Sequence, residues 1–302
     1  MSGTVTGGGG AGDQGIDTNT GSGGITIINL NSGADISAVS GNAIVNDDGN
    51  STVNANAGSS VNGGISLGGG DDNLIVDGAD FSNVGLIDLG AGTDGIIVRN
   101  VTASFVGSDF TNTEGFKLES GMISLSGTAT TNVTVTGGSL SAGSSPGSLN
   151  IVGNLDLGIG GKTLVELGGL LAGSNYDQID VEDNLSTGPV EGIASLADGT
   201  IFDIDWFGGF TANLGDMFDI LVADTINVSD INNVVFDFSD AALGSGLVWE
   251  FSIVNDGGHD TLRLEVAADS GPVPEPGTIL IMLGGLRGFR LLRKRHQKRK
   301  AA

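Results

Sequence analysis

A ten-residue segment occurs twice in this chain, 22 residues apart, and this repeat limits the folds open to it. Residues 67–76 read LGGGDDNLIV and residues 89–98 read LGAGTDGIIV. Self-similarity at this period is typical of coils that stack and bury a shared core. From Ile25 to Ser145 the chain consists of β-branched runs of three to five residues between Gly, Asn, Asp and Ser, without helical spacing. The sequence therefore predicts an all-β chain in which residues 25–145 form a right-handed parallel β-helix.

Residues 146–268 differ in composition, because they hold both Trp and the only Tyr of the chain. Apolar residues alternate at period two along one predicted strand, at Leu247, Trp249, Phe251 and Ile253. Aromatic and β-branched residues in this pattern are typical of half-buried strands. We expect this second β region either to cap the β-helix or to form a separate sandwich.

The charge of the chain is strongly divided. The last sixteen positions, from Arg287 onward, hold eight basic residues, which leaves four cations against 36 acids in the body, a net charge of −32. Such a body does not bind nucleic acid by neutralising phosphates. The absence of Cys excludes disulfide scaffolds, Cys-type zinc sites and thiol nucleophiles, and only two His argue against a Ser-His-Asp site. By the positive-inside rule, the basic end would stay in the cytoplasm and the acidic body would lie outside.

The C-terminal end combines a Pro-rich linker at 269–277, an apolar segment that starts at Thr278 and a terminal basic cluster. This order resembles the PEP-CTERM protein-sorting signal. The resemblance implies that the recognised segment consists of Val273, Pro274, Glu275, Pro276 and Gly277. It implies a membrane stop signal at Arg293, Lys294, Arg295, Lys298, Arg299 and Lys300.

In that family a membrane-embedded protease, exosortase, reads the Pro-Glu-Pro segment and removes the tail. Members are exported by Gram-negative bacteria that make exopolysaccharide. The resemblance implies exosortase as a partner and a transient inner-membrane anchor within 278–302, formed by a short hydrophobic helix. Residues 278–292 would span about 22 Å, less than the roughly 30 Å of a bilayer core, which suits a temporary anchor. The alternative is an amphipathic helix that packs on the body or lies on a membrane.

Residues 1–24 are nearly all Gly, Ser, Thr, Asp and Asn, so we expect a disordered start. A secretory signal needs a charged segment and an apolar segment, and neither precedes Ile25. Because the tail indicates export, we expect the natural chain to start upstream with a signal peptide.

A second resemblance covers residues 145–266. The segments at 145–155, 164–169, 176–181 and 215–221 resemble, in order and approximate spacing, the last part of autotransporter passenger regions. In autotransporters an outer-membrane barrel follows, whereas here the sorting tail stands in its place. The resemblance implies a surface stalk or adhesin.

The two repeat segments also resemble half of a calcium-binding nonapeptide, Gly-Gly-x-Gly-x-Asp-x-apolar. The candidate ligands are Asp71, Asp72 and Asp94. Leu replaces the first Gly in both segments, and an offset of 22 does not match the 18-residue coil that two nonapeptides make. Calcium takes about six to eight oxygens, whereas a turn needs only an Asp that caps its amides. We therefore expect no metal or other cofactor, with calcium as the alternative.

Carboxylates near the predicted strands could pair as in a glycosidase, and the candidates are Glu166, Asp177, Asp180, Asp203 and Asp205. None lies in an aromatic-rich motif, and chance pairs are common among 36 acids. His259 lies in a predicted hairpin turn, where a solvated His is expected.

We expect a non-enzymatic, structural or adhesive protein of the cell surface or extracellular matrix, with exopolysaccharide as one candidate partner. One alternative is a β-helical polysaccharide-active enzyme of the lyase type, which would need a cationic cluster from Arg99, Lys117 and Lys162. The other alternative is a calcium-dependent repeat adhesin.

Overall fold

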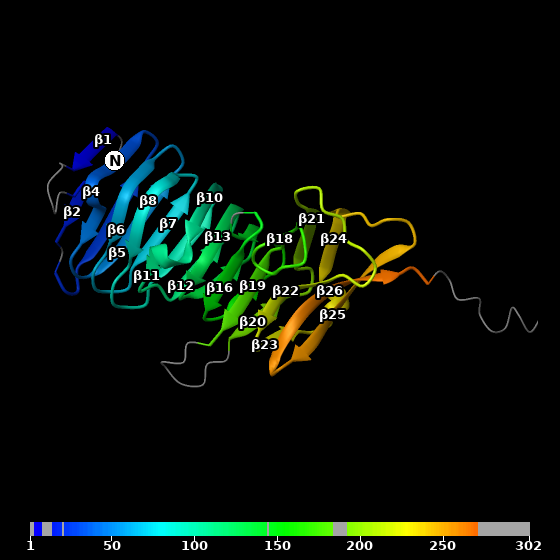
Figure 1. Ribbon diagram of the computed structural model, residues 1–302. Helices are drawn as coiled ribbons and strands as arrows, with labels where there is room; N and C mark the ends of the chain where they lie inside the picture. Colours follow the sequence, from blue (N-terminus) through cyan, green and yellow to red (C-terminus); the bar gives the residue numbers. More distant parts are fainter. Residues whose placement is uncertain (1–2, 8–13, 20, 144, 184–191, 271–302) are drawn as a thin grey trace, which may run out of the picture.

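The computed structural model describes residues 3–7, 14–19, 21–143, 145–183 and 192–270. Within these ranges the chain winds into a parallel β-helix that runs from the N-terminal to the C-terminal end of an elongated body (Figure 1). One long sheet forms one side, and two further sheets curl around the other sides. The predicted all-β fold and the predicted β-helix are confirmed.

The strands fall into three sheets. The nine-stranded sheet contains β3 (Ile25–Leu30), β5 (Asn50–Asn56), β7 (Asn73–Asp77), β9 (Gly95–Arg99), β12 (Gly115–Leu118), β14 (Asn132–Val135), β17 (Leu155–Leu157), β20 (Ile193–Leu196) and β23 (Thr225–Val228). The six-stranded sheet contains β1 (Gly3–Gly7), β2 (Ile16–Thr18), β4 (Ala34–Asn46), β6 (Ser60–Ser66), β8 (Asp80–Asp88) and β11 (Phe110–Thr111).

The eleven-stranded sheet contains β10 (Val101–Val106), β13 (Gly121–Ala129), β15 (Gly138–Ala142), β16 (Ser148–Val152), β18 (Gly161–Leu167), β19 (Gln178–Glu182), β21 (Ile201–Trp206), β22 (Met217–Ala223), β24 (Val235–Asp240), β25 (Leu247–Asp256) and β26 (His259–Ala268). Two short 3-10 helices complete the elements, η1 (Gly107–Asp109) and η2 (Ile231–Asn233).

The pairing of β7 with β9 explains the sequence repeat. Leu74 lies beside Ile96 in the parallel register, which is the same offset of 22 residues that separates the two repeat segments. Both side chains point into the core and are at most 2% exposed. Phe116 and Val133 continue this inward column on the next two coils. Each coil thus adds one apolar layer to a continuous core.

Several strands are longer than the three to five residues predicted. The longest parallel strand is β4, with thirteen residues, and its pairing with β6 shifts register at Asn42. Gly41, just before that shift, has φ +98°, a conformation that favours glycine. A strand that bends at an irregularity of this kind can continue around a corner of the solenoid without a loop.

The first part of the chain corrects an expectation. Residues 1–24 were predicted to be disordered, but β1 and β2 both pair in parallel with β4. An existing sheet edge offers backbone partners to any extended segment, whatever its hydrophobic pattern. Val5 and Ile16 also pack against the core, which adds apolar contacts that a disordered segment would lack.

The second β region continues the same solenoid and ends in a cap. β16 pairs in parallel with β13 on one side and with β19 on the other, so the described strands do not form a separate sandwich. The antiparallel pair β25–β26 then closes the end, with β26 also paired to β22. The inward residues Leu262, Leu264 and Val266 of β26 are fully buried, as their alternation predicts.

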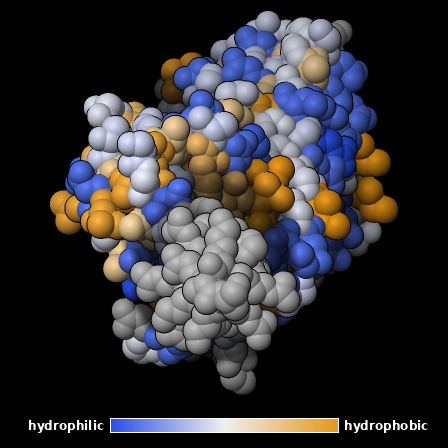
Figure 2. Space-filling view, turned by 90° about the vertical axis from the view of Figure 1, so that its right-hand side faces the viewer, coloured by the Kyte–Doolittle hydropathy of each residue, from blue (hydrophilic) through white to orange (hydrophobic). Residues whose placement is uncertain are grey.

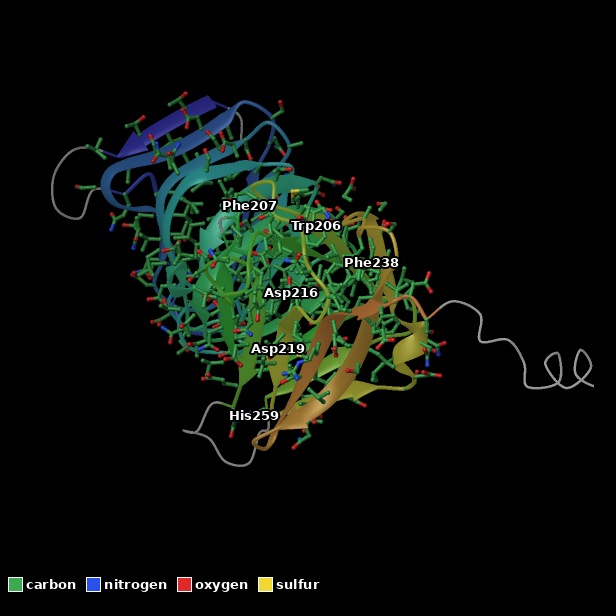
Figure 3. All side chains as sticks on the ribbon, turned by 45° about the vertical axis from the view of Figure 1, so that its right-hand side comes forward. Trp206, Phe207, Asp216, Asp219, Phe238 and His259 are labelled. Carbon is green, nitrogen blue, oxygen red and sulfur yellow. The ribbon has the colours of Figure 1, made fainter. Side chains whose placement is uncertain are left out.

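Aromatic side chains close the C-terminal end between the edge strands β24 and β25. Phe236 stacks on Phe251 with ring centroids 4.2 Å apart, and Phe238 stacks on Trp249 at 5.2 Å. Figure 3 shows Trp206 and Phe238 at this end and His259 at the tip of the β25–β26 hairpin. Apolar surface remains visible when the molecule is viewed onto this end (Figure 2).

The described elements include no helix that is long and apolar enough to cross a membrane. The predicted hydrophobic helix, the Pro-Glu-Pro segment and the basic cluster all lie outside the described residues.

Candidate functional site

Carboxylates at one corner of the solenoid link successive coils. Asp72 Oδ1 accepts the backbone N–H of Ser51 on the preceding coil at 2.5 Å. The N–H of Asp72 donates to Asp94 Oδ1 at 2.6 Å, and the N–H of Asp94 donates to Glu114 Oε2 at 2.7 Å. We call Asp72, Asp94 and Glu114 the acid ladder. Each carboxylate reaches back by one coil, so the ladder ties together coils that are distant in sequence.

The two Asp side chains of the acid ladder are buried. Asp72 is fully buried and Asp94 is 3% exposed, and the Oδ2 atoms of both have no hydrogen-bond partner among the described residues. Burial raises the pKa of Asp72 to about 6, against the lowering effect of the Ser51 N–H. Burial also raises the pKa of Asp94, and the neighbouring Glu114 adds to the rise. These carboxylates therefore cost stability when they ionise.

The three calcium candidates act as acceptors for backbone amides. Asp71 Oδ1 accepts the N–H of Thr93 at 3.0 Å, while Asp72 and Asp94 accept the amides of the acid ladder. Within the described part of the chain, no group of three or more His, Asp or Glu side chains is arranged to hold a metal ion. The geometry agrees with the interpretation that these Asp cap amides, although the capped amides belong to neighbouring coils.

The carboxylate candidates of the second region are spread over separate places. Glu166 on β18 lies beside Asp205 on β21 in the register, and Asp203 lies two positions before Asp205 on the outer face of β21. Burial is the main cause of the raised pKa values of Asp205 and Asp180. Asp180 lies on another strand, β19. The structure therefore brings only Glu166, Asp203 and Asp205 to one surface.

Asp177 is a buried carboxylate that accepts hydrogen bonds from the backbone of two other segments. It is 2% exposed, Oδ1 accepts the N–H of Gly147 at 2.6 Å, and Oδ2 accepts the N–H of Glu166 at 3.0 Å. Burial raises its pKa to about 7. Both oxygens accept amides of other segments, so this carboxylate connects Gly147, just before β16, with strand β18.

The cations that a lyase would need lie on different sheets. Arg99 and Lys117 share the carboxylate of Glu119, at 2.5 and 2.7 Å, beside the nine-stranded sheet. Lys162 pairs with Asp203 at 2.8 Å on the eleven-stranded sheet. The structure therefore does not bring the three cations together.

His259 lies in the predicted hairpin. Its strand pairs with β25 across Gly257 and Gly258, which both have positive φ, as a tight two-residue turn requires. Its Nδ1 atom lies 2.9 Å from Asp224 Oδ1, and its side chain is 55% exposed. This is the solvated turn position that the sequence indicates.

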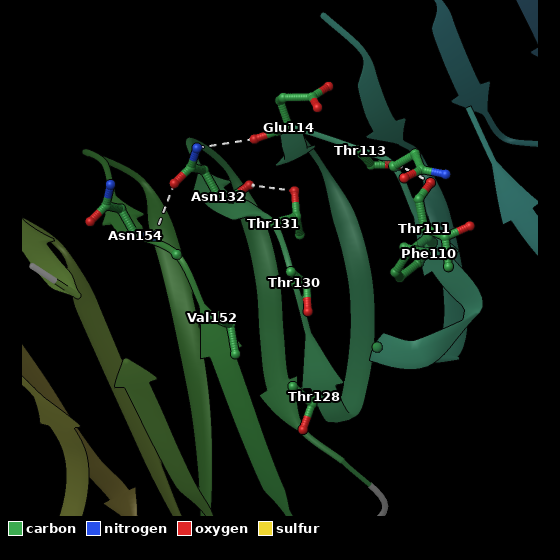
Figure 4. A pocket seen from close by; sticks show the side chains of 13 residues that line it. Phe110, Thr111, Thr113, Glu114, Thr128, Thr130, Thr131, Asn132, Val152 and Asn154 are labelled. Atoms are coloured by element: carbon green, nitrogen blue, oxygen red, sulfur yellow. Dashed lines mark hydrogen bonds between the residues drawn. The ribbon is translucent and has the colours of Figure 1, made fainter. Parts of the chain in front are cut away.

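One hollow in the described surface was not predicted from the sequence. It has a volume of about 810 Å³ and is lined by residues from the segments 107–114, 128–132 and 152–154, on three successive coils. We call it the threonine groove, because Thr111, Thr113, Thr128, Thr130 and Thr131 all line it. In Figure 4 the side chains of Phe110 and Thr111 lie across the hollow from those of Thr128 and Thr130.

A comparison with protein-family models and a comparison with curated proteins found no match for this chain. The structure alone defines the class of fold, which is a parallel β-helix with an antiparallel cap.

Proposed function

We propose that this protein is an exported, non-enzymatic structural or adhesive protein of the cell surface or extracellular matrix, sorted through a PEP-CTERM tail. The body is an elongated solenoid, and the tail supplies the sorting signal. In this proposal exosortase and the inner membrane are transient partners of residues 273–302, and the body remains outside after cleavage.

One observation carries the structural half of the proposal. The buried carboxylates of Asp72, Asp94 and Asp177 all accept backbone N–H groups from other coils or segments. Carboxylates used in this way hold the solenoid together, which is the task of a scaffold. An acidic body with a net charge of −32 also remains soluble outside the cell and resists self-association.

The sequence of the tail supports the sorting half of the proposal. Pro274 and Pro276 hold Glu275 in an extended segment with few donors, which suits recognition in a protease cleft. The basic residues 293–300 would stop translocation on the cytoplasmic side. The short apolar segment between them would hold the recognised segment at the membrane surface.

The test is the intact mass of the exported protein, produced with a signal peptide in hosts with and without exosortase. With exosortase, the protein should lose everything after about Pro276, and without it the protein should stay in the inner membrane. Replacing Pro274, Glu275 and Pro276 by Ala should leave the tail uncut, whereas Pro272→Ala, outside the motif, should not change cleavage. Recovery of secreted wild-type protein that still carries residues 293–300 would contradict the proposal.

A further inference from the structure

We propose that the threonine groove binds an uncharged glycan chain by hydrogen bonds. This inference rests on the proposed extracellular function, because it names a class of partner for that function. It is argued from the shape, the hydrogen-bonding groups and the charge of the groove.

The groove exists because the solenoid wall is interrupted there. The six-stranded sheet ends at β11, and β13 pairs with β16 in the eleven-stranded sheet rather than with β11. The 3-10 helix η1 takes the place of a paired strand between them, and Gly107 at its start lies against the backbone of Thr128. A Cβ atom on Gly107 would lie 2.4 Å from the carbonyl carbon of Thr128, so this close approach requires glycine.

The hollow has the size of a ligand site and a firm base. Its volume of about 810 Å³ lies within the roughly 300–1,000 Å³ typical of ligand pockets. Phe110, at 4% exposure, packs against Phe105 and Phe116 with ring centroids 5.4 and 5.3 Å away. A base made by three packed rings does not collapse into the hollow above it.

Several polar groups in the groove have no protein partner. The hydroxyls of Thr128 and Thr130, both on exposed residues, make no hydrogen bond within the described residues. Thr111 Oγ1, at the opposite side, also has no partner among the described residues, but this atom is buried and therefore out of reach of a ligand. Each hydroxyl can donate one hydrogen bond and accept others, as the hydroxyls of a sugar can. A polyhydroxylated chain would therefore find two matching hydroxyls, those of Thr128 and Thr130, on one side of the groove.

Charge selects among glycans. The groove contains Glu114 and no cation, and Asp88 lies beside it as the partner of Asn112 at 2.8 Å. Arg99 on β9 and Lys117 on β12 are both paired with Glu119. An acidic glycan would meet a surface of its own sign, whereas an uncharged glycan has no such penalty.

The experiment is affinity electrophoresis of the purified full chain in native gels that contain one soluble polysaccharide each. Dextran, mixed-linkage β-glucan and galactomannan are the uncharged probes, and alginate and polygalacturonate are the acidic ones. At least one uncharged polysaccharide should retard the protein, and the acidic ones should not. The variant T128V/T130V removes two hydroxyls and keeps side-chain shape and β-propensity, so it should weaken retardation about ten-fold.

The matched control is Thr102→Val, an outward Thr on β10 that does not line the groove, and it should behave like the wild type. Circular dichroism and melting temperature establish that the variants fold alike. No retardation in any uncharged gel, equal retardation of wild type and T128V/T130V, or stronger retardation in alginate would each overturn the proposal. A failure of glycan binding can be told apart from a failure of the proposed sorting function by the mass assay of the tail. The groove variants should still be cleaved and released normally in that assay.

Discussion

The carboxylate of Asp72 binds the backbone N–H of Ser51, a residue 21 positions earlier in the chain and one coil away in space. The side chain thereby satisfies an amide near the start of β5, one position before the ladder between β5 and β7 begins. The carboxylate of Asp72 is fully buried, and its second oxygen, Oδ2, has no partner among the described residues. Asp72 thus fastens two coils while its negative charge opposes burial.

Asp72 should make the stability of the fold depend on pH. Because burial raises its pKa from 3.8 to about 6, the stabilisation is complete below about pH 4 and is lost as the pH rises through 6. A shift of this size corresponds to at most about 3 kcal/mol. Asp72→Asn keeps an oxygen that accepts the Ser51 N–H and cannot ionise. Its unfolding free energy in urea should therefore fall less than that of the wild type between pH 4 and 7.

The control for this prediction is Asp71→Asn, because Asp71 is the exposed neighbour that also accepts a backbone N–H. The pH profile of Asp71→Asn should differ from that of the wild type less than the profile of Asp72→Asn does, because the charge of Asp71 is only a minor cause of the raised pKa of Asp72. Identical pH profiles for Asp72→Asn and the wild type would show that Asp72 is not the group responsible.

Removing the side chain of Asp177 should destabilise the fold strongly. Asp177→Ala leaves the buried amide of Gly147 without its acceptor, at a cost of about 1–3 kcal/mol, and also the partly buried amide of Glu166, at a smaller cost. Asp156→Ala, on the exposed face of β17, should change the unfolding free energy by less than about 0.5 kcal/mol. Denaturant unfolding at neutral pH measures both, and equal effects of the two variants would contradict the structural role of Asp177.

The aromatic cap should be required for stability. Trp249 stacks on Phe238, and its Nε1–H donates to the carbonyl of Ala241 at 3.0 Å. Trp249→Ala removes both contacts and should cost about 2–4 kcal/mol, less than a fully buried Trp, because the side chain is partly exposed. Trp249→Phe should recover most of the loss, since it keeps the ring stack. If Trp249→Phe were as unstable as Trp249→Ala, the stack would not be the stabilising contact.

Calcium should have little effect on the protein. Asp71, Asp72 and Asp94 each use one oxygen for a backbone amide, which leaves too few oxygens at one point for the six to eight that calcium takes. We expect 1 mM CaCl₂ to leave the melting temperature unchanged and calorimetry to detect no micromolar site. A micromolar site that is lost in the double variant D72A/D94A would instead favour the calcium-dependent adhesin.

The coils could be predicted because the sequence of each coil contains recognisable local patterns. The 22-residue repeat is the register of β7 and β9, and the alternation Leu262, Leu264, Val266 is the buried face of β26. The alternation involves neighbours in one strand, and each copy of the repeat is a continuous segment, so both features can be recognised without knowing which residues meet in space. The hairpin at Gly257 and Gly258 was predictable for the same reason, since turn chemistry is local.

The acid ladder and the threonine groove depend on pairs of residues from different coils. Turn-forming residues predict a corner of the solenoid. They do not indicate that the Asp94 carboxylate accepts a hydrogen bond from the N–H of Asp72, 22 residues away. One signal was present: Asp72, Asp94 and Glu114 each precede a strand of the nine-stranded sheet by one position. The groove has no such signal, because it arises from η1 displacing a strand pair, which residue types alone do not indicate.

The register of the nine-stranded sheet stays parallel while the number of residues per turn of the solenoid changes greatly. Gly115 pairs with Asn132 after 17 residues, whereas Leu155 pairs with Ala194 after 39. Every turn nevertheless advances the sheet by one strand, about 4.8 Å. The length of this rod is therefore counted in turns and not in residues. Sequence added at a corner widens the molecule sideways, and only a complete new turn makes it longer.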